Sequence, residues 1–172
     1  PPITFQSENG IKLRLTVHTP AIIQLKYVCS VDQHSSFSYA IDPQFNPKVP
    51  DFTLQEQDEY FLLTTESVQC RIGKKKMKTH FLDTNGQHLC RDKQPFLRTD
   101  SIMKGIKKVS ITKEAPEDAQ YFGMGDKTSH GNLRGHQFEN WNTDAYAYER
   151  GDDPLYRSIP FYAALRDGQA YG

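Results

Sequence analysis

Hydrophobic and polar residues alternate along much of this chain. Every second residue from Ile11 to Val17 is hydrophobic, and the same spacing returns from Ile23 to Cys29 after a break at Pro20. Because successive side chains of a strand point to opposite faces of a sheet, this pattern predicts two strands that each bury one face. Shorter runs of a similar kind predict further strands at residues 60–63, 68–72, 79–83, 87–90 and 108–111.

Turn residues separate these runs, and helix signals are rare. Asn85-Gly86 lies between two runs and predicts a hairpin, because both residues of this pair adopt positive φ readily. One helix start is predicted at residues 115–118, where a proline and two acids suit a first turn, with an end at Gly123. The stretch 31–51, which contains three prolines, is predicted to be a loop. Many short strands with little helix predict an antiparallel sandwich or barrel.

The end of the chain has the pattern of an unfinished hairpin. Residues 155–165 form a strand-like run, and Asp167-Gly168 then provides a hairpin turn. A return strand is expected to follow, but the chain stops at Gly172. The pattern therefore favours a polypeptide that continues past this point.

The composition fits one folded domain. The chain has 172 residues, 37% hydrophobic content and a formal net charge of zero. A domain of this size buries roughly 70% of the surface that its unfolded chain exposes, and disorder is favoured instead by low hydrophobicity with high net charge. No apolar run approaches the roughly 18 residues of a membrane span. No signal peptide is recognisable, and no membrane partner is expected.

Basic residues are concentrated in the middle of the chain. Residues 71–115 contain twelve Lys or Arg and four Asp or Glu, and the density is highest at Lys74, Lys75, Lys76 and Lys78. Such a stretch suits either a nucleic-acid surface or loops and sheet edges on which lysines block strand addition. No aromatic residues are interleaved with these lysines. The second interpretation is therefore favoured, and no nucleic-acid partner is expected.

The cysteines and histidines match no metal or redox motif. Cys29, Cys70 and Cys90 form no Cys-x-x-Cys pair and are predicted to be reduced, buried thiols, which slightly favours a cytoplasmic location. His130 and His136 lie six residues apart, without a third ligand at helical or hairpin spacing. Neither a metal site nor a cofactor is therefore expected.

Four sequence blocks near the end of the chain carry the most specific signal. They are Tyr-Phe-Gly-Met-Gly-Asp from residue 121, Asn-Leu-Arg-Gly from 132, Glu-Asn-Trp-Asn-Thr-Asp from 139 and Asp-Pro-Leu-Tyr-Arg-Ser-Ile-Pro-Phe-Tyr from 153. In this order and spacing they resemble the end of the amino-terminal domain of family 31 glycoside hydrolases. Residues 10–40 are similar to an earlier part of the same domain. One departure is Asp126, where the family more often has glutamate.

This resemblance implies the fold and the reaction of a larger enzyme. Residues 1–172 would form an all-β, antiparallel β-sandwich of the galactose-mutarotase type, a supersandwich, packed against a (β/α)8 catalytic barrel that follows it. Members of the family are retaining α-glycosidases, whose nucleophile and acid/base are two carboxylates about 5–5.5 Å apart. Both come from the barrel, so no catalytic residue is expected in this chain. The implied partners are the chain's own barrel and an α-glucoside or oligosaccharide substrate.

The resemblance also implies a substrate-binding loop at residues 142–156, which would reach over the mouth of the barrel, where barrel active sites lie. Asp144 matches a family aspartate that hydrogen-bonds sugar hydroxyls, a role that suits an ionised carboxylate. Tyr146 is a second candidate for the same pocket. In an alternative interpretation, Asp144 is a turn residue that bonds to its own backbone. Trp141 is expected to pack in the core or between domains, and Arg134 to brace the sandwich through a buried pair.

Two other functions fit parts of the same pattern. A free-standing carbohydrate-binding module would account for the 12% aromatic content and the loop tyrosines. An aldose mutarotase shares the implied fold and needs a base and an acid, for which His130, His136 and Glu139 are available, although mutarotases are larger proteins. Within the resembled family, α-glucosidase is the commonest activity, while xylosidases, glucan lyases and transglycosylases carry the same domain.

Overall fold

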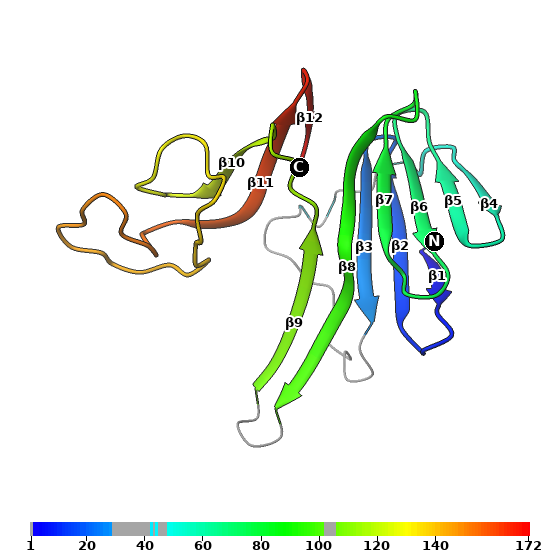
Figure 1. Cartoon of the computed structure of the whole chain (residues 1–172), viewed down its shortest axis with the longest axis horizontal. Coiled ribbons are helices and arrows are strands. Elements are labelled where there is room, and N and C mark those ends of the chain that lie inside the picture. Colours follow the sequence, from blue (N-terminus) through cyan, green and yellow to red (C-terminus); the bar gives the residue numbers. More distant parts are fainter. Residues whose placement is uncertain (1, 29–41, 43, 45–47, 102–105) are drawn as a thin grey trace. The chain divides into compact units, whose positions relative to one another are not determined.

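The computed structural model divides into two compact units, Pro1–Glu114 and Ala115–Gly172. The residues that it describes are 2–28, 42, 44, 48–101 and 106–172. Among these residues the only regular secondary structure is β-strand, and every strand pair is antiparallel (Figure 1). The predicted all-β, antiparallel class is therefore confirmed. No helix in the described part of the chain is long and apolar enough to cross a membrane.

The first unit begins with a three-stranded sheet whose strands are neighbours in sequence order. They are β1 (Ile3–Gln6), β2 (Lys12–Thr19) and β3 (Ile22–Val28). Leu13 and Leu15 of β2 have no exposed surface, whereas Arg14 between them is exposed. The predicted alternation is thus confirmed, because one face of β2 is buried and the other meets solvent.

A six-stranded sheet forms the rest of the first unit. Its strands, also in sequence order, are β4 (Thr53–Glu56), β5 (Tyr60–Thr64), β6 (Gln69–Gly73), β7 (Thr79–Leu82), β8 (His88–Ser101) and β9 (Ile106–Lys113). The hairpin predicted at Asn85-Gly86 connects β7 to β8, but of these two residues only Gly86 has positive φ, at 80°. The Asp83 N–H donates to the Gln87 carbonyl (2.9 Å). The turn is therefore wider than the predicted two-residue type.

The core of the first unit lies between its two sheets (Figure 1). Its buried residues are Phe5, Leu13, Leu15 and Val17 from the three-stranded sheet and Leu63, Cys70, Ile72 and Met77 from the six-stranded sheet and its turns. Two antiparallel sheets that cover each other's apolar faces form a β-sandwich. The core thus follows directly from the alternation along the strands.

The buried thiols are confirmed for two of the three cysteines. Cys70 and Cys90 are both buried. Burial raises the pKa of the Cys70 thiol to about 12, so this thiol stays protonated at neutral pH. Cys29 and most of the predicted loop 31–51 lie outside the described residues.

The second unit is built on a three-stranded sheet in sequence order. Its strands are β10 (Gln120–Gly125), β11 (Ser158–Arg166) and β12 (Gln169–Tyr171). A β-bulge between Gly123 and Gly125 interrupts the pairing of β10 with β11. The hairpin predicted at Asp167-Gly168 joins β11 to β12, and both residues have positive φ, at 50° and 75°. The expected return strand is present as the 3 residues of β12.

Two predictions about element positions in this unit are wrong. Residues 115–118 start no helix: the Ala119 N–H donates to the Pro116 carbonyl (3.1 Å) in a single turn, and β10 begins at Gln120. Proline and acidic residues suit such turns as well as helix starts, and pairing with β11 outweighs a weak local preference for helix. The strand predicted from residue 155 begins at Ser158.

Candidate functional site

The connection between β10 and β11, residues 126–157, carries two of the four sequence blocks and the first half of the last one. It is drawn in yellow to orange in Figure 1, and this connection, which is described throughout, contains neither helix nor strand. Its backbone polar groups therefore depend on individual side-chain and main-chain hydrogen bonds rather than on a sheet ladder. Each of those bonds positions particular residues.

A buried ion pair lies at the base of this connection. The Lys127 ammonium is 2.5 Å from the Asp153 carboxylate, and the two side chains are only 4% and 14% exposed. Lys127 also donates to the Glu139 carbonyl (3.1 Å), while the Glu139 N–H donates to Asp153. The ammonium lies 5.2 Å from the centroid of the Phe138 ring. Three segments far apart in sequence are thus joined at one point.

These partners keep Asp153 ionised. Burial by itself raises the pKa of its carboxyl. Hydrogen bonds from Lys127 and from the Glu139 N–H lower this pKa by a larger amount, so the net pKa lies below its ordinary value. A buried carboxylate is tolerated when a cation and hydrogen-bond donors compensate its charge. The pair is therefore a structural element of this connection.

Residues 142–156 form a loop whose two ends are held together. The Thr143 N–H donates to the Leu155 carbonyl (2.9 Å), and the Ser158 N–H donates to the Asn142 side-chain oxygen (2.7 Å). Leu155 is buried, with 4% of its surface exposed. The loop therefore leaves and rejoins the unit at one fixed place.

The predicted site residues, Asp144 and Tyr146, lie on the exposed part of this loop. Tyr146 is 94% exposed. Asp144 is also exposed, and its carboxylate has no hydrogen bond or ion pair to any residue that the structure describes, so the turn-bonded alternative is not observed. Beside them, Ala147 has a positive φ of 52°, which is uncommon for a residue with a side chain. The carboxylate can accept hydrogen bonds from hydroxyl groups, and the phenol can donate, accept or stack.

A second tyrosine of the loop contacts this tip. The Tyr156 hydroxyl donates to the Ala145 carbonyl at 2.6 Å, and Ala145 is the residue between Asp144 and Tyr146. The Tyr156 ring packs edge-to-face against Tyr148, with ring centroids 6.0 Å apart. Sequence reasoning identified these tyrosines only as aromatic residues of a loop. No spacing signal could have found the hydroxyl contact, because spacing does not show which carbonyl a hydroxyl will reach.

Two more contacts tie the loop to residues that follow β10. The Thr128 hydroxyl accepts from the Gly151 N–H (2.7 Å) and donates to the Asp152 carbonyl (3.0 Å). The Asp126 carboxylate accepts two hydrogen bonds from the Arg157 guanidinium, each 3.0 Å long, and these lower the pKa of Asp126. Asp126 is therefore paired with an arginine immediately before β11.

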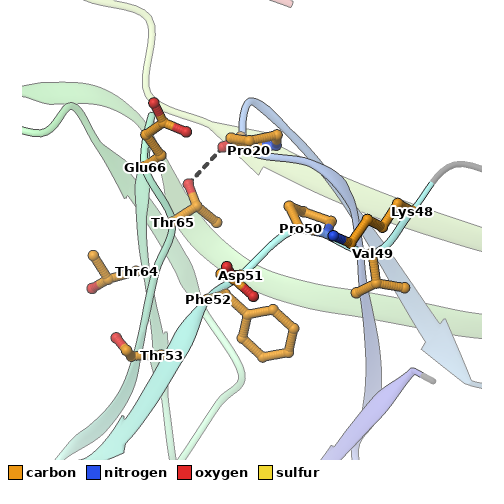
Figure 2. A pocket seen from close by; sticks show the side chains of 10 residues that line it. All are labelled: Pro20, Lys48, Val49, Pro50, Asp51, Phe52, Thr53, Thr64, Thr65 and Glu66. Atoms are coloured by element: carbon orange, nitrogen blue, oxygen red, sulfur yellow. Dashed lines mark hydrogen bonds between the residues drawn. The ribbon is translucent and has the colours of Figure 1, made fainter.

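Residues of the sequence blocks line a pocket of the second unit but not the pocket of the first unit that Pro20 lines. In the second unit, an open pocket of about 620 Å³ is lined by residues 126–128, 148–150 and 155–157. In the first unit, a pocket of about 520 Å³ is lined by Pro20 and residues 48–53 and 64–66, as Figure 2 shows. None of the four blocks contributes to this pocket of the first unit, and neither Asp144 nor Tyr146 lines the pocket of the second unit. The candidate site is therefore in the second unit.

The structure corrects the prediction for Arg134 and excludes one of the two positions expected for Trp141. Arg134 donates to the carbonyls of Pro116 and Ala115 (2.6 and 3.1 Å), so it braces the unit through the backbone and not through a buried pair. Trp141 is 67% exposed, so within this unit it is not a core residue. Its exposed indole is available for packing against another domain or a ligand.

The two histidines considered for acid–base or metal chemistry have other partners, and the third residue, Glu139, contributes only its backbone to the contacts found. His130 lies 2.6 Å, through Nε2, from the Arg150 guanidinium, and His136 stacks against the Phe138 ring. Glu139 is exposed, and its N–H belongs to the ion-pair network described above. Among the residues that the structure describes, no group of three or more His, Cys, Asp or Glu side chains could hold a metal ion.

Comparison with protein families gives one match that spans most of the chain. The model described as the glycosyl hydrolase 31 N-terminal galactose mutarotase-like domain matches residues 12–172. Alpha-glucosidase 2 of Bacillus thermoamyloliquefaciens is 25% identical over 178 residues, which cover 98% of this chain and 21% of that protein. An alpha-glucosidase of Saccharolobus solfataricus is 32% identical over 72 residues, covering 42% of this chain and 10% of the relative.

Comparison with solved structures also finds enzymes of glycoside hydrolase family 31. A GH31 dextranase from Flavobacterium johnsoniae, complexed with glucose, superimposes with a TM-score of 0.79 at 25% identity. That match covers 95% of this chain and 20% of the dextranase. A GH31 alpha-xylosidase from Xanthomonas citri has a TM-score of 0.63 at 21% identity, over 81% of this chain and 16% of the xylosidase, and shows a shared fold. The chain thus spans about a fifth of the length of the relatives that it matches almost throughout.

Proposed function

The chain belongs to the glycosyl hydrolase 31 N-terminal galactose mutarotase-like domain family, and from this membership we propose that it serves a larger retaining glycoside hydrolase of the α-glucosidase type. In this proposal the chain is a non-catalytic amino-terminal domain that supports a (β/α)8 barrel. Both compact units belong to that domain, because the family match runs through both. The observation that carries the proposal is a match over residues 12–172 to a domain of such enzymes.

The names of two relatives support α-glucoside hydrolysis. Both proteins that match by sequence are named alpha-glucosidases. In the retaining mechanism, a carboxylate attacks the anomeric carbon to form a glycosyl-enzyme intermediate, and a second carboxylate protonates the leaving oxygen and then activates water. We assign both carboxylates to the barrel. The domain then contributes binding and orientation rather than proton transfer.

The loop of residues 142–156 is the part of the domain that we propose to contact the sugar. Asp144 would accept hydrogen bonds from sugar hydroxyls, and Tyr146 would line the sugar-binding pocket that the loop forms with the barrel. Support comes from their exposure and from the unengaged Asp144 carboxylate, since a binding group has to be free to exchange water for ligand. The anchored loop ends support it as well, because an anchored loop loses less entropy when it binds.

The other two functions have less support. A mutarotase needs a base and an acid that face one sugar, and His130 is instead engaged by Arg150. A free-standing carbohydrate-binding module is less consistent with relatives in which the matching segment is about a fifth of a longer protein.

Replacing Asp144 with alanine in the full-length enzyme is expected to raise KM for a small α-glucoside about ten- to thirtyfold, because a hydrogen bond to a charged group contributes about 1.5–2 kcal/mol. The value of kcat should change little if the contact is equally strong in the ground state and the transition state. Steady-state hydrolysis of an aryl α-glucoside measures both constants.

The matched control for this experiment needs a carboxylate that lies outside the candidate site. Glu149 lines the second-unit pocket, so Glu117→Ala is the control: it removes an exposed carboxylate of the same unit, outside both the loop and that pocket. We expect its KM to stay close to that of the unmodified enzyme. An unchanged KM in Asp144→Ala would refute the role of the loop, and an absence of α-glucosidase activity in the full-length protein would refute the proposed reaction.

A further inference from the structure

We propose that Tyr156 is a positioning residue for the loop tip, acting through its hydroxyl on the Ala145 carbonyl to set the direction of the Asp144 carboxylate. This inference rests on the proposed function of the loop and deepens it. It assigns a role in sugar binding to a residue outside the loop's ligand-contacting tip. Tyr156 itself need not touch the substrate.

The geometry that carries the inference is a pair of hydrogen bonds on either side of Asp144. On the amino-terminal side, the Thr143 N–H is held by the Leu155 carbonyl at 2.9 Å. On the carboxyl-terminal side, the Ala145 carbonyl is held by the Tyr156 hydroxyl at 2.6 Å. The peptides at the two ends of the segment Thr143–Asp144–Ala145 are therefore held by two successive residues, Leu155 and Tyr156. Because the Cα–Cβ direction follows from the backbone, the Asp144 carboxylate is limited to the few staggered rotamers about one held Cα–Cβ bond.

Both holding residues have contacts of their own, although Tyr156 is 45% exposed. Leu155 is 4% exposed. The next residue, Tyr156, packs its ring edge-to-face on Tyr148 at 6.0 Å, an arrangement that aromatic rings favour. Its other neighbour, Arg157, makes two hydrogen bonds to Asp126. A hydroxyl on such a support can hold a partner that is otherwise exposed to solvent.

The tip needs such a support because it has few contacts of its own. Tyr146 is 94% exposed, Ala147 has a positive φ of 52°, and the Asp144 side chain has no partner among the described residues. Without the bond to Tyr156, the peptide between Ala145 and Tyr146 would be free to rotate. Binding would then have to order it, which weakens affinity.

Tyr156→Phe in the full-length enzyme tests this role, because it removes the hydroxyl and keeps the ring. We expect KM for an aryl α-glucoside to rise roughly three- to tenfold, the factor that corresponds to one neutral hydrogen bond. The value of kcat and the melting temperature should stay close to those of the unmodified enzyme. Tyr121→Phe is the matched control, since it removes from the same unit a buried hydroxyl that has no hydrogen-bond partner among the described residues, and its KM should not change.

A double-mutant cycle with Asp144→Ala separates this inference from the proposed function. If Tyr156 acts through Asp144, Tyr156→Phe should raise KM in the unmodified enzyme but have little further effect in the Asp144→Ala background. Equal effects in both backgrounds, or a loss of kcat and melting temperature without a change in KM, would overturn the positioning role. If Asp144→Ala raises KM and Tyr156→Phe does not, only the inference fails. If Asp144→Ala leaves KM unchanged, the proposed function of the loop is wrong, and the inference about Tyr156, which rests on it, is wrong as well.

Discussion

Gly125→Ala is expected to destabilise the second unit by about 3 kcal/mol or more and to disrupt the pairing of β10 with β11. Gly125 has a φ of +85°, a conformation that costs an alanine roughly 1–2 kcal/mol. An added Cβ would also overlap the Arg157 carbonyl oxygen and lie 2.9 Å from the Ile159 nitrogen. Both are backbone atoms, one in β11 and one in the residue just before it, so they cannot rotate away as a flexible side chain would. Hydrogen exchange of the β10 and β11 amides measures the effect.

Two other glycines of the same unit separate the causes of this loss. Gly135 has a φ of +79° but no atom within 4 Å of an added Cβ, so Gly135→Ala should show only the conformational cost of roughly 1 kcal/mol. Gly131 has neither a positive φ nor a close neighbour, and Gly131→Ala should be nearly neutral. If Gly125→Ala lost no more stability than Gly135→Ala, the proposed overlap with the partner backbone would be wrong.

Lys127→Met is expected to lower the stability of the second unit by about 3 kcal/mol, because removal of one partner leaves a buried charge uncompensated. Asp153 would keep the N–H of Glu139 but lose the ammonium 2.5 Å away, at a position where its side chain is 14% exposed. Urea unfolding followed by circular dichroism measures the loss. The effect should extend to residues 138–139, since they are held by the same two side chains.

The double variant Lys127→Met/Asp153→Asn distinguishes a true ion pair from two independent contributions. Asparagine keeps an oxygen for the Glu139 N–H and removes the charge that Lys127 balances. The double variant should therefore be more stable than the sum of the single losses implies. Strict additivity of the two losses would contradict the pairing.

The ion pair also predicts the direction of a pH effect. The pKa of Asp153 is lower in the folded protein than its ordinary value. Its contribution to stability is therefore present above the ordinary pKa of about 4 and is lost as the pH falls through the lowered value. The stability difference between the unmodified protein and Lys127→Met should accordingly shrink below about pH 4. A difference that grows on acidification would contradict this assignment.

The sequence predicted correctly those features that depend only on consecutive residues. The alternation around Leu13 and Leu15 identified a strand together with its buried face, because strand periodicity is a property of consecutive residues. Asp167-Gly168 identified a hairpin, because positive φ at both turn positions is a property of those residues. The four blocks between residues 121 and 162 identified the family for a similar reason, since they can be compared without knowledge of their contacts.

Local patterns failed where one motif fits two structures or where a contact partner is distant. A proline with two acids fits a turn as well as a helix start, and the pairing of β10 with β11 decided in favour of the turn at residues 116–119. Arg134 was expected to meet an acid and instead binds two carbonyls. Trp141 was expected in the core or between domains, and its exposure of 67% excludes only the core.

By itself, the sequence determined the all-β class, the strand alternation, the hairpin positions and the family, together with Asp144 and Tyr146 as candidate ligand contacts. Only the tertiary structure decided how that loop is held: the Lys127–Asp153 pair, the hydrogen bonds of Leu155 and the contact from Tyr156 to Ala145. The physical reason is that strand periodicity and turn conformation depend on neighbours in the chain. Hydrogen bonds across 11 or 26 residues depend on where folding brings the partners.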